Sequence, residues 1–117
     1  MFITFCKSKI AHGTVTEAQL YYEGSITIDE SLLKAVDVIP GEKVEVLNIN
    51  NGNRLETYVI AGKAGSGHIC LNGPAARMGC VGDKIIILSY ALLDKATEAK
   101  KAKTKIIYLD DKNRIRP

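Results

Sequence analysis

The sequence has no tryptophan, no low-complexity tract and no run near the roughly 20 apolar residues that a membrane-spanning helix needs. Residues 1–6 lack the basic region and long apolar segment of a secretion signal. We therefore expect a cytoplasmic protein that does not associate with membranes.

Cysteine is scarce, and its spacing is uninformative. Cys6, Cys70 and Cys80 are odd in number and show none of the paired spacings typical of zinc sites. Free thiols in a reducing compartment are therefore expected, with no disulfide and no metal site.

The chain also lacks a charge of one sign along its whole length. The net charge is +3, but residues 100–117 hold seven Lys or Arg against Asp110 and Asp111, which leaves nine basic and eleven acidic residues in 1–99. The body is thus slightly acidic, which argues against a nucleic-acid partner. Residues 62–67 contain three glycines but lack the order of a phosphate-binding loop, so a phosphate-bearing cofactor is not expected.

The 117 residues, 46% of them hydrophobic, are typical of one globular domain spanning 1–117. Short Val- and Ile-rich runs separated by turn residues favour strands over helices. Little helix and many short strands indicate a mainly β fold, a small closed barrel. Strands are expected over 2–10, 14–20, 25–28, 43–49, 54–61, 68–72, 84–90 and 106–109, and helices over 30–36, 74–78 and 92–101.

The dipeptide Gly24-Ser25 lies at the start of the strand expected over 25–28, and its peptide bond could undergo a reaction within the chain. A serine hydroxyl can attack the preceding carbonyl and turn the amide into an ester, and glycine removes the Cβ that would crowd the attack. Elimination and hydrolysis then leave a pyruvoyl ketone, an electron sink of the kind that proteins otherwise take from cofactors. On its own, Gly-Ser is also an ordinary turn pair.

Further polar residues admit two interpretations each. Arg54, Glu56 and Tyr58 share one face of the strand expected over 54–61. Arg54 could clamp a carboxylate and Tyr58 could pass a proton, or the face could be an exposed charge pair beside a rim tyrosine. Lys9 likewise could have a role in binding or could be an ordinary surface lysine. The pair at 72–73 is either a turn or an amide that holds an oxyanion.

Several separated motifs nevertheless resemble one family, the pyruvoyl-dependent aspartate 1-decarboxylases. The resemblance covers nearly the whole chain, without gaps from Lys9 to Asp83. It rests on Ser8-Lys9-Ile10, Val15-Thr16, Leu20, Tyr22, Gly24-Ser25-Ile26-Thr27-Ile28-Asp29, Asn51-Gly52, Arg54, Thr57-Tyr58-Val59-Ile60, Asn72-Gly73, Ala75-Ala76 and Gly82-Asp83.

The resemblance implies a double-psi β-barrel with a few short helices, assembled as a homotetramer. It also implies self-cleavage between Gly24 and Ser25 into a small chain, 1–24, and a large chain, 25–117, that begins with a pyruvoyl group derived from Ser25. In this family that group forms a Schiff base with L-aspartate, CO2 leaves, and β-alanine is released for pantothenate and coenzyme A synthesis. The cut proceeds either unaided or with a maturation factor.

By similarity, site roles fall on particular residues of this chain. Ser25 and Tyr58 are the catalytic positions, with Tyr58 as the proton donor. The substrate-binding positions are Lys9, Arg54, Thr57, Gly73, Pro74 and Ala75. The positions that assist self-cleavage are Gly24, Ser25, Thr57, Tyr58 and Asn72.

Two positions depart from the family pattern. The family usually carries histidine where Ala11 stands here, and His12 follows one residue later. In a strand this displacement turns the side chain to the opposite face unless a bulge intervenes. Pro74 stands where alanine is common, which fixes φ and removes one backbone donor.

Two other functions fit parts of the same pattern. One is a non-enzymatic β-barrel, an assembly or DNA-binding module of the swapped-hairpin transcription-factor type, which also shows Pro-Gly-Glu-Lys-Val strands. The other is a family member that folds but does not process itself.

Overall fold

The computed structural model describes residues 1–117. Its strands are β1 (Phe2–Thr14), β2 (Glu17–Gln19), β3 (Ser25–Asp29), β4 (Lys43–Asn48), β5 (Arg54–Gly62), β6 (Ile69–Asn72), β7 (Lys84–Asp94) and β8 (Lys105–Tyr108). Its helices are α1 (Glu30–Ala35), the 3-10 helix η1 (Gly73–Arg77) and α2 (Glu98–Lys101). No helix is long and apolar enough to cross a membrane.

The eight strands form one mixed sheet in the order β2-β6-β3-β5-β4-β7-β1-β8. The strand β2 is at one end of this order and β1 is near the other, yet the two follow each other directly in the chain. The sheet therefore closes on itself where β1 continues into β2. At that junction the Thr16 N–H donates to the Ile69 carbonyl at 2.8 Å, and the Val15 N–H donates to the Asp83 carbonyl at 3.0 Å. Six elements, with β1 and β2 counted as one, therefore enclose the core.

Two parallel strand pairs interleave within this ring. β2 lies parallel to β6, and β3 lies parallel to β5, while the remaining pairs in the ring are antiparallel. Parallel partners need crossovers, so neighbours in space are distant in sequence. The expected mainly β class and the double-psi β-barrel are confirmed.

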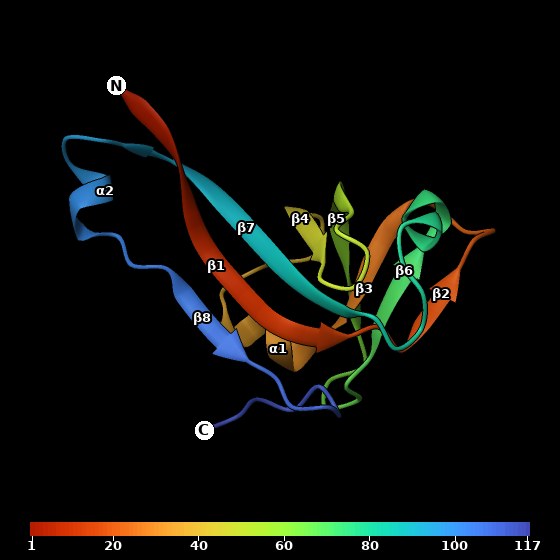
Figure 1. Ribbon diagram of the computed structural model, residues 1–117. Helices are drawn as coiled ribbons and strands as arrows, with labels where there is room; N and C mark the ends of the chain where they lie inside the picture. The colour runs from red at the N-terminus through yellow and green to blue at the C-terminus, as the bar shows by residue number, and fades with distance from the viewer.

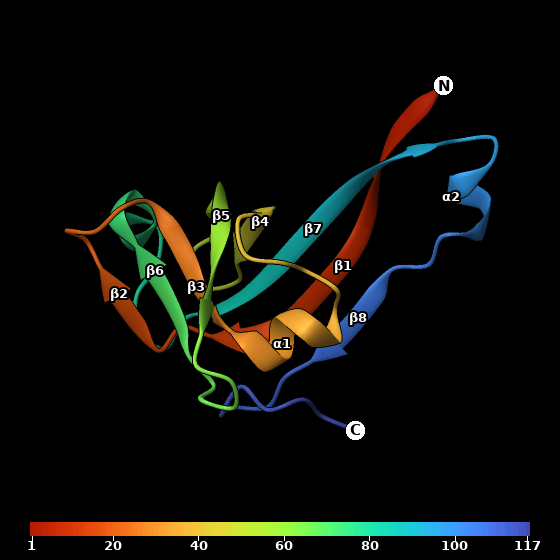
Figure 2. The same cartoon turned by 180° about the vertical axis from the view of Figure 1, so that it is seen from behind.

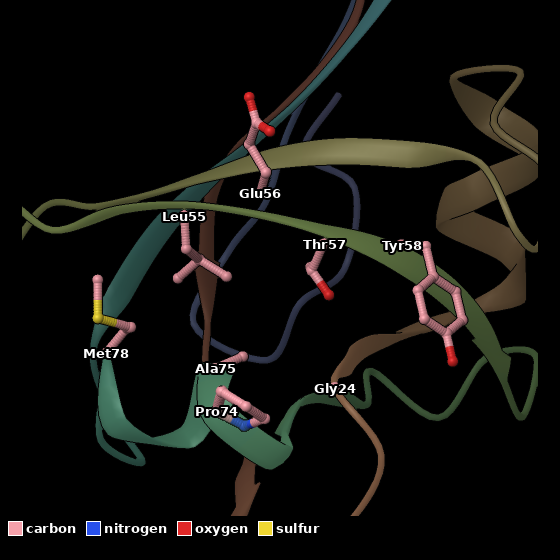
Figure 3. Close-up of a pocket in the computed structure, with 8 residues that line it drawn as sticks. All are labelled: Gly24, Leu55, Glu56, Thr57, Tyr58, Pro74, Ala75 and Met78. Atoms are coloured by element: carbon pink, nitrogen blue, oxygen red, sulfur yellow. The ribbon is translucent and has the colours of Figure 1, made fainter.

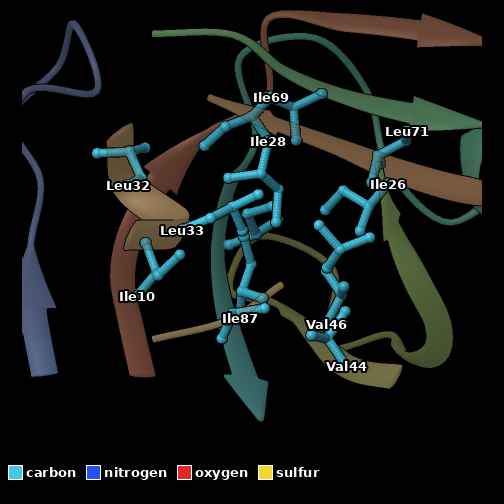
Figure 4. Close-up of a cluster of buried hydrophobic side chains, with 14 of the residues drawn as sticks. Ile10, Ile26, Ile28, Leu32, Leu33, Val44, Val46, Ile69, Leu71 and Ile87 are labelled. Atoms are coloured by element: carbon cyan, nitrogen blue, oxygen red, sulfur yellow. The ribbon is translucent and has the colours of Figure 1, made fainter. Parts of the chain in front are cut away.

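The core consists of β-branched and leucine side chains from all sides of the ring (Figure 4). Ile26 and Ile28 of β3 point inward, and Leu32 and Leu33 of α1 belong to the same buried cluster (Figure 4). The strand β3 is buried along most of its length. Ser25, its first residue, therefore sits in a rigid wall.

Asp29 fixes the far end of the same strand. Its carboxylate accepts from the backbone N–H groups of Ser31 at 2.8 Å, Gly65 at 3.0 Å and Gly67 at 2.9 Å. Burial alone would raise the pKa of the Asp29 carboxyl, but these hydrogen bonds outweigh it and hold the pKa below its usual value. Asp29 thus caps α1, as its position after a strand predicts, and it also holds the loop between β5 and β6.

The helix expected over 92–101 is wrong in extent. β7 continues to Asp94, which pairs with Phe2, and only Glu98–Lys101 is helical. The pairing with the long strand β1 outweighs the local helix preference of this segment. The paired ends of β1 and β7 project from the barrel as a ribbon, with α2 beyond them (Figures 1 and 2).

The strand β1 contains a bulge at the position of the displaced histidine. The register with β7 shifts between Ile10 and Gly13, and His12 adopts φ 65° while Ala11 is buried. The extra residue is accommodated by the bulge, and His12 faces the C-terminal segment, with its ring 6.4 Å from that of Tyr108.

Candidate active site

Ser25 lies at the start of β3, between β6 on one side and β5 on the other. In the antiparallel pair with β6 its partner is Asn72. In the parallel pair with β5 the register begins at Ile26 and Val59, so Tyr58 is the corresponding neighbour one residue earlier. Strand pairing therefore places three sequence-predicted residues side by side.

The hydroxyl of Ser25 is fully buried and fully engaged. It accepts a hydrogen bond from Asn72 Nδ2 at 3.0 Å and donates to the carbonyl of Glu23 at 3.3 Å. The second contact turns the oxygen back toward the backbone just upstream of Gly24. A buried hydroxyl held against its own preceding chain is well placed for an intramolecular reaction.

Asn72 is itself held by its neighbours. Its Nδ2 also donates to Thr27 Oγ1 at 2.9 Å, and its Oδ1 accepts from the thiol of Cys70 at 3.0 Å. Burial, followed by the nearby carboxylate of Glu17, raises the pKa of the Cys70 thiol to about 11, so the thiol stays protonated and remains a donor at neutral pH. The carboxamide orientation follows from these contacts.

Gly73 brings the next segment against Gly24. It adopts φ +64°, and a Cβ built there would lie 2.5 Å from the Tyr22 carbonyl and 2.9 Å from the Gly24 nitrogen. Only glycine fits both the dihedral and the approach. The start of η1 is thus packed on the backbone that contains the candidate scissile bond.

A cavity of ≈ 510 Å³ opens beside this bond (Figure 3). Thr57 and Tyr58 of β5 extend toward Gly24, and Pro74 and Ala75 of η1 form the opposite wall (Figure 3). The volume suits a small ligand. Five of the sequence-predicted residues line it: Gly24, Thr57, Tyr58, Pro74 and Ala75.

Two predicted substrate-binding cations are not part of this cavity. Arg54 is exposed, and its Nη1 lies 3.3 Å from the Glu45 carboxylate. Lys9 lies on β1, where it pairs with Leu88 of β7 and Ile106 of β8. The candidate site thus has two parts. The serine side, around Ser25, Asn72 and Gly24, is built by one chain, and the cation side, Arg54 and Lys9, lies outside its cavity.

The alternation expected along β5 is present. Arg54, Glu56 and Tyr58 are exposed, and Leu55 and Thr57 between them are half-buried. Glu56 pairs with Lys43 at 2.9 Å, and its carboxylate points away from Thr57 and Pro74 (Figure 3).

Several residues near the site were not identified from the sequence. Leu55, Glu56 and Met78 complete the cavity lining, and Thr27 and Cys70 belong to the hydrogen bonds around Asn72. Thr27 lies two residues after Ser25 on a strand, so strand periodicity could have placed it on the same face. Cys70 lies two residues before Asn72 on β6, so the same periodicity could have placed it beside Asn72.

The site chemistry fits a ketone formed in place from Ser25. The hydroxyl, its hydrogen-bond donor Asn72 and the side-chain-free Gly24 are adjacent, and the cavity reaches Gly24, the residue directly before Ser25. Tyr58 would face such a substrate from β5.

Comparison with known proteins agrees with the family resemblance found in the sequence. The model of a family described as aspartate decarboxylase matches residues 1–116. The Aspartate 1-decarboxylases of Acetivibrio thermocellus and Caldicellulosiruptor bescii are 58% and 59% identical over 98% of this chain, and the matches cover 90% and 89% of those proteins. That of Listeria monocytogenes serotype 4b is 56% identical over 98% of this chain and 90% of its own.

Among solved structures, a rationally designed protein, mkDPBB_sym_86, is similar to part of the chain. The TM-score is 0.48 and the sequence identity 18%, over 68% of this chain and 91% of that one. A likeness this distant supports no conclusion about function.

Proposed function

Because the chain belongs to the aspartate decarboxylase family, we propose that it cuts itself between Gly24 and Ser25 to form the pyruvoyl group used by this family. With that group the family converts L-aspartate into β-alanine and CO2, a carboxy-lyase reaction that feeds pantothenate synthesis. The observation that carries the proposal is the buried Ser25 hydroxyl, held by Asn72 at 3.0 Å beside the Gly24 cavity.

The cut is an intramolecular rearrangement. Ser25 Oγ attacks the Gly24 carbonyl carbon, the Gly24–Ser25 amide bond breaks, and an ester replaces it. Elimination across the Ser25 Cα–Cβ bond releases Gly24 as a carboxylate and leaves dehydroalanine, and water then displaces ammonia to give the ketone. Asn72 and Thr57 are proposed to orient the reacting groups, and Tyr58 to exchange protons with them.

In the mature enzyme the ketone supplies an electrophile for the amine of aspartate and a sink for the electrons left when CO2 departs. The chain's own residues do the rest. Tyr58 borders the cavity beside Ser25 and is proposed to deliver a proton to the carbon that loses CO2. Thr57 and the segment 73–75 are proposed to contact the substrate.

The substrate carboxylates need cations that the cavity of one chain does not contain. Arg54 is proposed to exchange its single contact with Glu45 for a substrate carboxylate, which a guanidinium can bind through two hydrogen bonds. Lys9 lies on another part of the sheet. If it binds substrate, it must come from a neighbouring copy, which supports the proposed homotetramer.

Aromatic and aliphatic side chains are exposed on the projecting ribbon and the strand beside it, as a subunit interface requires. They are Phe2, Tyr90, Leu92, Ile106 and Tyr108. The three free thiols fit the proposed cytoplasmic location.

Intact mass spectrometry and a denaturing gel of freshly purified protein test the proposal. We expect two fragments, 1–24 and 25–117, with the larger one blocked at its N-terminus and one ammonia lighter than the serine form. A time course with and without cell extract shows whether a maturation factor is needed. Borohydride reduction with aspartate present should then attach substrate to the large fragment.

An uncut chain after prolonged warming, in extract as well as in buffer, would contradict the proposal. That result would favour a family member that does not process itself. A barrel acting only as an assembly or DNA-binding module predicts the same uncut chain, and it also predicts binding to nucleic acid or to a partner protein.

A further inference from the structure

Three side chains with metal-binding atoms meet on the outer side of the β2–β6 pair. The atoms of Glu17, His68 and Cys70 all lie within 4.8 Å of one another. Strands β2 and β6 lie side by side (Figure 1), and Glu17 and Cys70 are directly opposed in their parallel register. His68 precedes Cys70 by two residues, so both side chains project to the same face. The sequence predicted no metal site, because Glu17 is distant from the other two along the chain.

We propose that these three residues form a binding site for a zinc ion, with the fourth position open to water. Zinc favours this combination of thiolate, imidazole and carboxylate, and three protein ligands with one open position is a common arrangement. The proposal concerns a site outside the Gly24 cavity and does not require the chain to cut itself.

The distances fit tetrahedral zinc. Bonds of about 2.0–2.3 Å place neighbouring tetrahedral ligands roughly 3.3–3.8 Å apart. Glu17 Oε2 lies 3.4 Å from Cys70 Sγ and 3.8 Å from His68 Nε2. Two of the three distances between ligand atoms are therefore close to those of a zinc site, and the third, between Cys70 Sγ and the His68 ring nitrogen, is within 4.8 Å.

The imidazole is oriented for coordination. Thr16 Oγ1 donates to the Ile69 carbonyl at 3.0 Å and lies 3.4 Å from His68 Nδ1. With its own proton used on Ile69, Thr16 accepts from Nδ1–H, which leaves the Nε2 lone pair free on the side of Glu17. Metal-bound histidines are commonly oriented in this way through their other nitrogen.

Access and charge also fit. The side chains of His68 and Glu17 are 34% and 46% exposed, so an ion can reach the buried Cys70 sulfur along them. On binding, the Cys70 S–H bond breaks, the sulfur–zinc bond forms and the proton passes to solvent. The thiolate and the carboxylate then balance the charge of the ion.

Metal binding is coupled to the residue that holds Ser25. The thiol of Cys70 lies nearer to Asn72 Oδ1, at 3.0 Å, than to Glu17 Oε2, at 3.4 Å, so the proton that zinc displaces is taken from the Cys70–Asn72 hydrogen bond. The ion and this hydrogen bond therefore exclude each other. An Asn72→Ala chain, which lacks the competing acceptor, should bind zinc several-fold more tightly than the wild type. Equal or weaker binding would contradict this coupling.

Cobalt(II) is the probe for the site, since it reports thiolate ligation in its absorption spectrum. The wild-type chain should bind one equivalent with a thiolate-to-cobalt charge-transfer band and tetrahedral ligand-field bands, and zinc should remove both. Cys70→Ser should lose the charge-transfer band. Glu17→Gln and His68→Gln should weaken cobalt binding at least tenfold.

The chain provides matched controls. His12→Gln removes its other histidine, and Cys80→Ser removes an exposed thiol; both should bind cobalt as the wild type does. The uncut Ser25→Ala chain should also bind it, so this result does not depend on the proposed function. Absence of the band at one equivalent, its survival in Cys70→Ser, or its loss in Cys80→Ser would overturn the proposal.

Discussion

Ser25 and Arg54 lie on paired strands of the same barrel, in very different surroundings. The Ser25 hydroxyl is 0% exposed and is held from both sides by Asn72 and the Glu23 carbonyl. Arg54 has a side chain that is 65% exposed and pairs with Glu45. A reaction within the chain needs only groups that folding itself brings together, whereas substrate binding requires groups that remain free until the substrate arrives. One chain therefore holds the Ser25 hydroxyl in place by itself, whereas it leaves Arg54 on an exposed face, paired with Glu45.

Replacement of Ser25 by alanine tests the serine side most directly. Ser25→Ala should remain full-length and inactive, because the hydroxyl is the proposed nucleophile of the cut and the proposed source of the ketone. Mass spectrometry and an assay for β-alanine measure both effects. The exposed Ser66 gives a control, since Ser66→Ala should cut and turn over normally. β-Alanine production by Ser25→Ala would eliminate the mechanism.

Tyr58→Phe should lower kcat by about 10²–10⁴ with a smaller change in KM, because it removes the proposed proton donor beside the cavity. The assay is made on the cleaved fraction, so that any delay in processing does not enter the rate. Tyr108→Phe is the matched control, since Tyr108 lies on β8 and does not line the Gly24 cavity. Equal kcat for Tyr58→Phe and the wild type would remove Tyr58 from the reaction.

Asn72→Ala should slow self-cleavage roughly 10–100-fold, the effect of one lost hydrogen bond to a buried reacting group. A gel time course measures the rate, and circular dichroism checks that the barrel is intact. Asn51→Ala, in the turn between β4 and β5, should cut at the wild-type rate. A wild-type rate in the Asn72 variant would show that the contact with Ser25 is only structural.

On the cation side, Arg54→Lys should raise KM for aspartate about tenfold with little change in kcat, since an ammonium cannot replace the bidentate fork. Glu45→Gln should act in the opposite direction, by a few-fold, because it frees the guanidinium. Steady-state kinetics on cleaved protein measure both. If KM is unchanged in each variant, Arg54 does not bind substrate. The difference in exposure between Ser25 and Arg54 would then say nothing about substrate binding.

Much of the fold was predictable from the sequence. Strand alternation identified β4 and β5, and the turn at 51–52 between them is where it was expected. The segment 92–101 was predicted incorrectly, because the pairing of Phe2 with Asp94 is a long-range contact that no local pattern contains. The sequence allowed His12 to lie either on a regular strand or in a bulge, and it could not decide between them. The choice depends on the register between β1 and β7.

The sequence by itself determined which reactive groups the chain has: a serine after a glycine, a tyrosine and an arginine on one strand face, an asparagine before a glycine, and the family to which this order belongs. Only the tertiary structure decided which of them meet. Asn72 contacts Ser25 across 47 residues, and Glu17 contacts Cys70 across 53, while Arg54 and Lys9 stay apart from both. The physical reason is that strand pairing, set by the burial of a shared core, brings distant residues together in a register that no local stretch of sequence encodes.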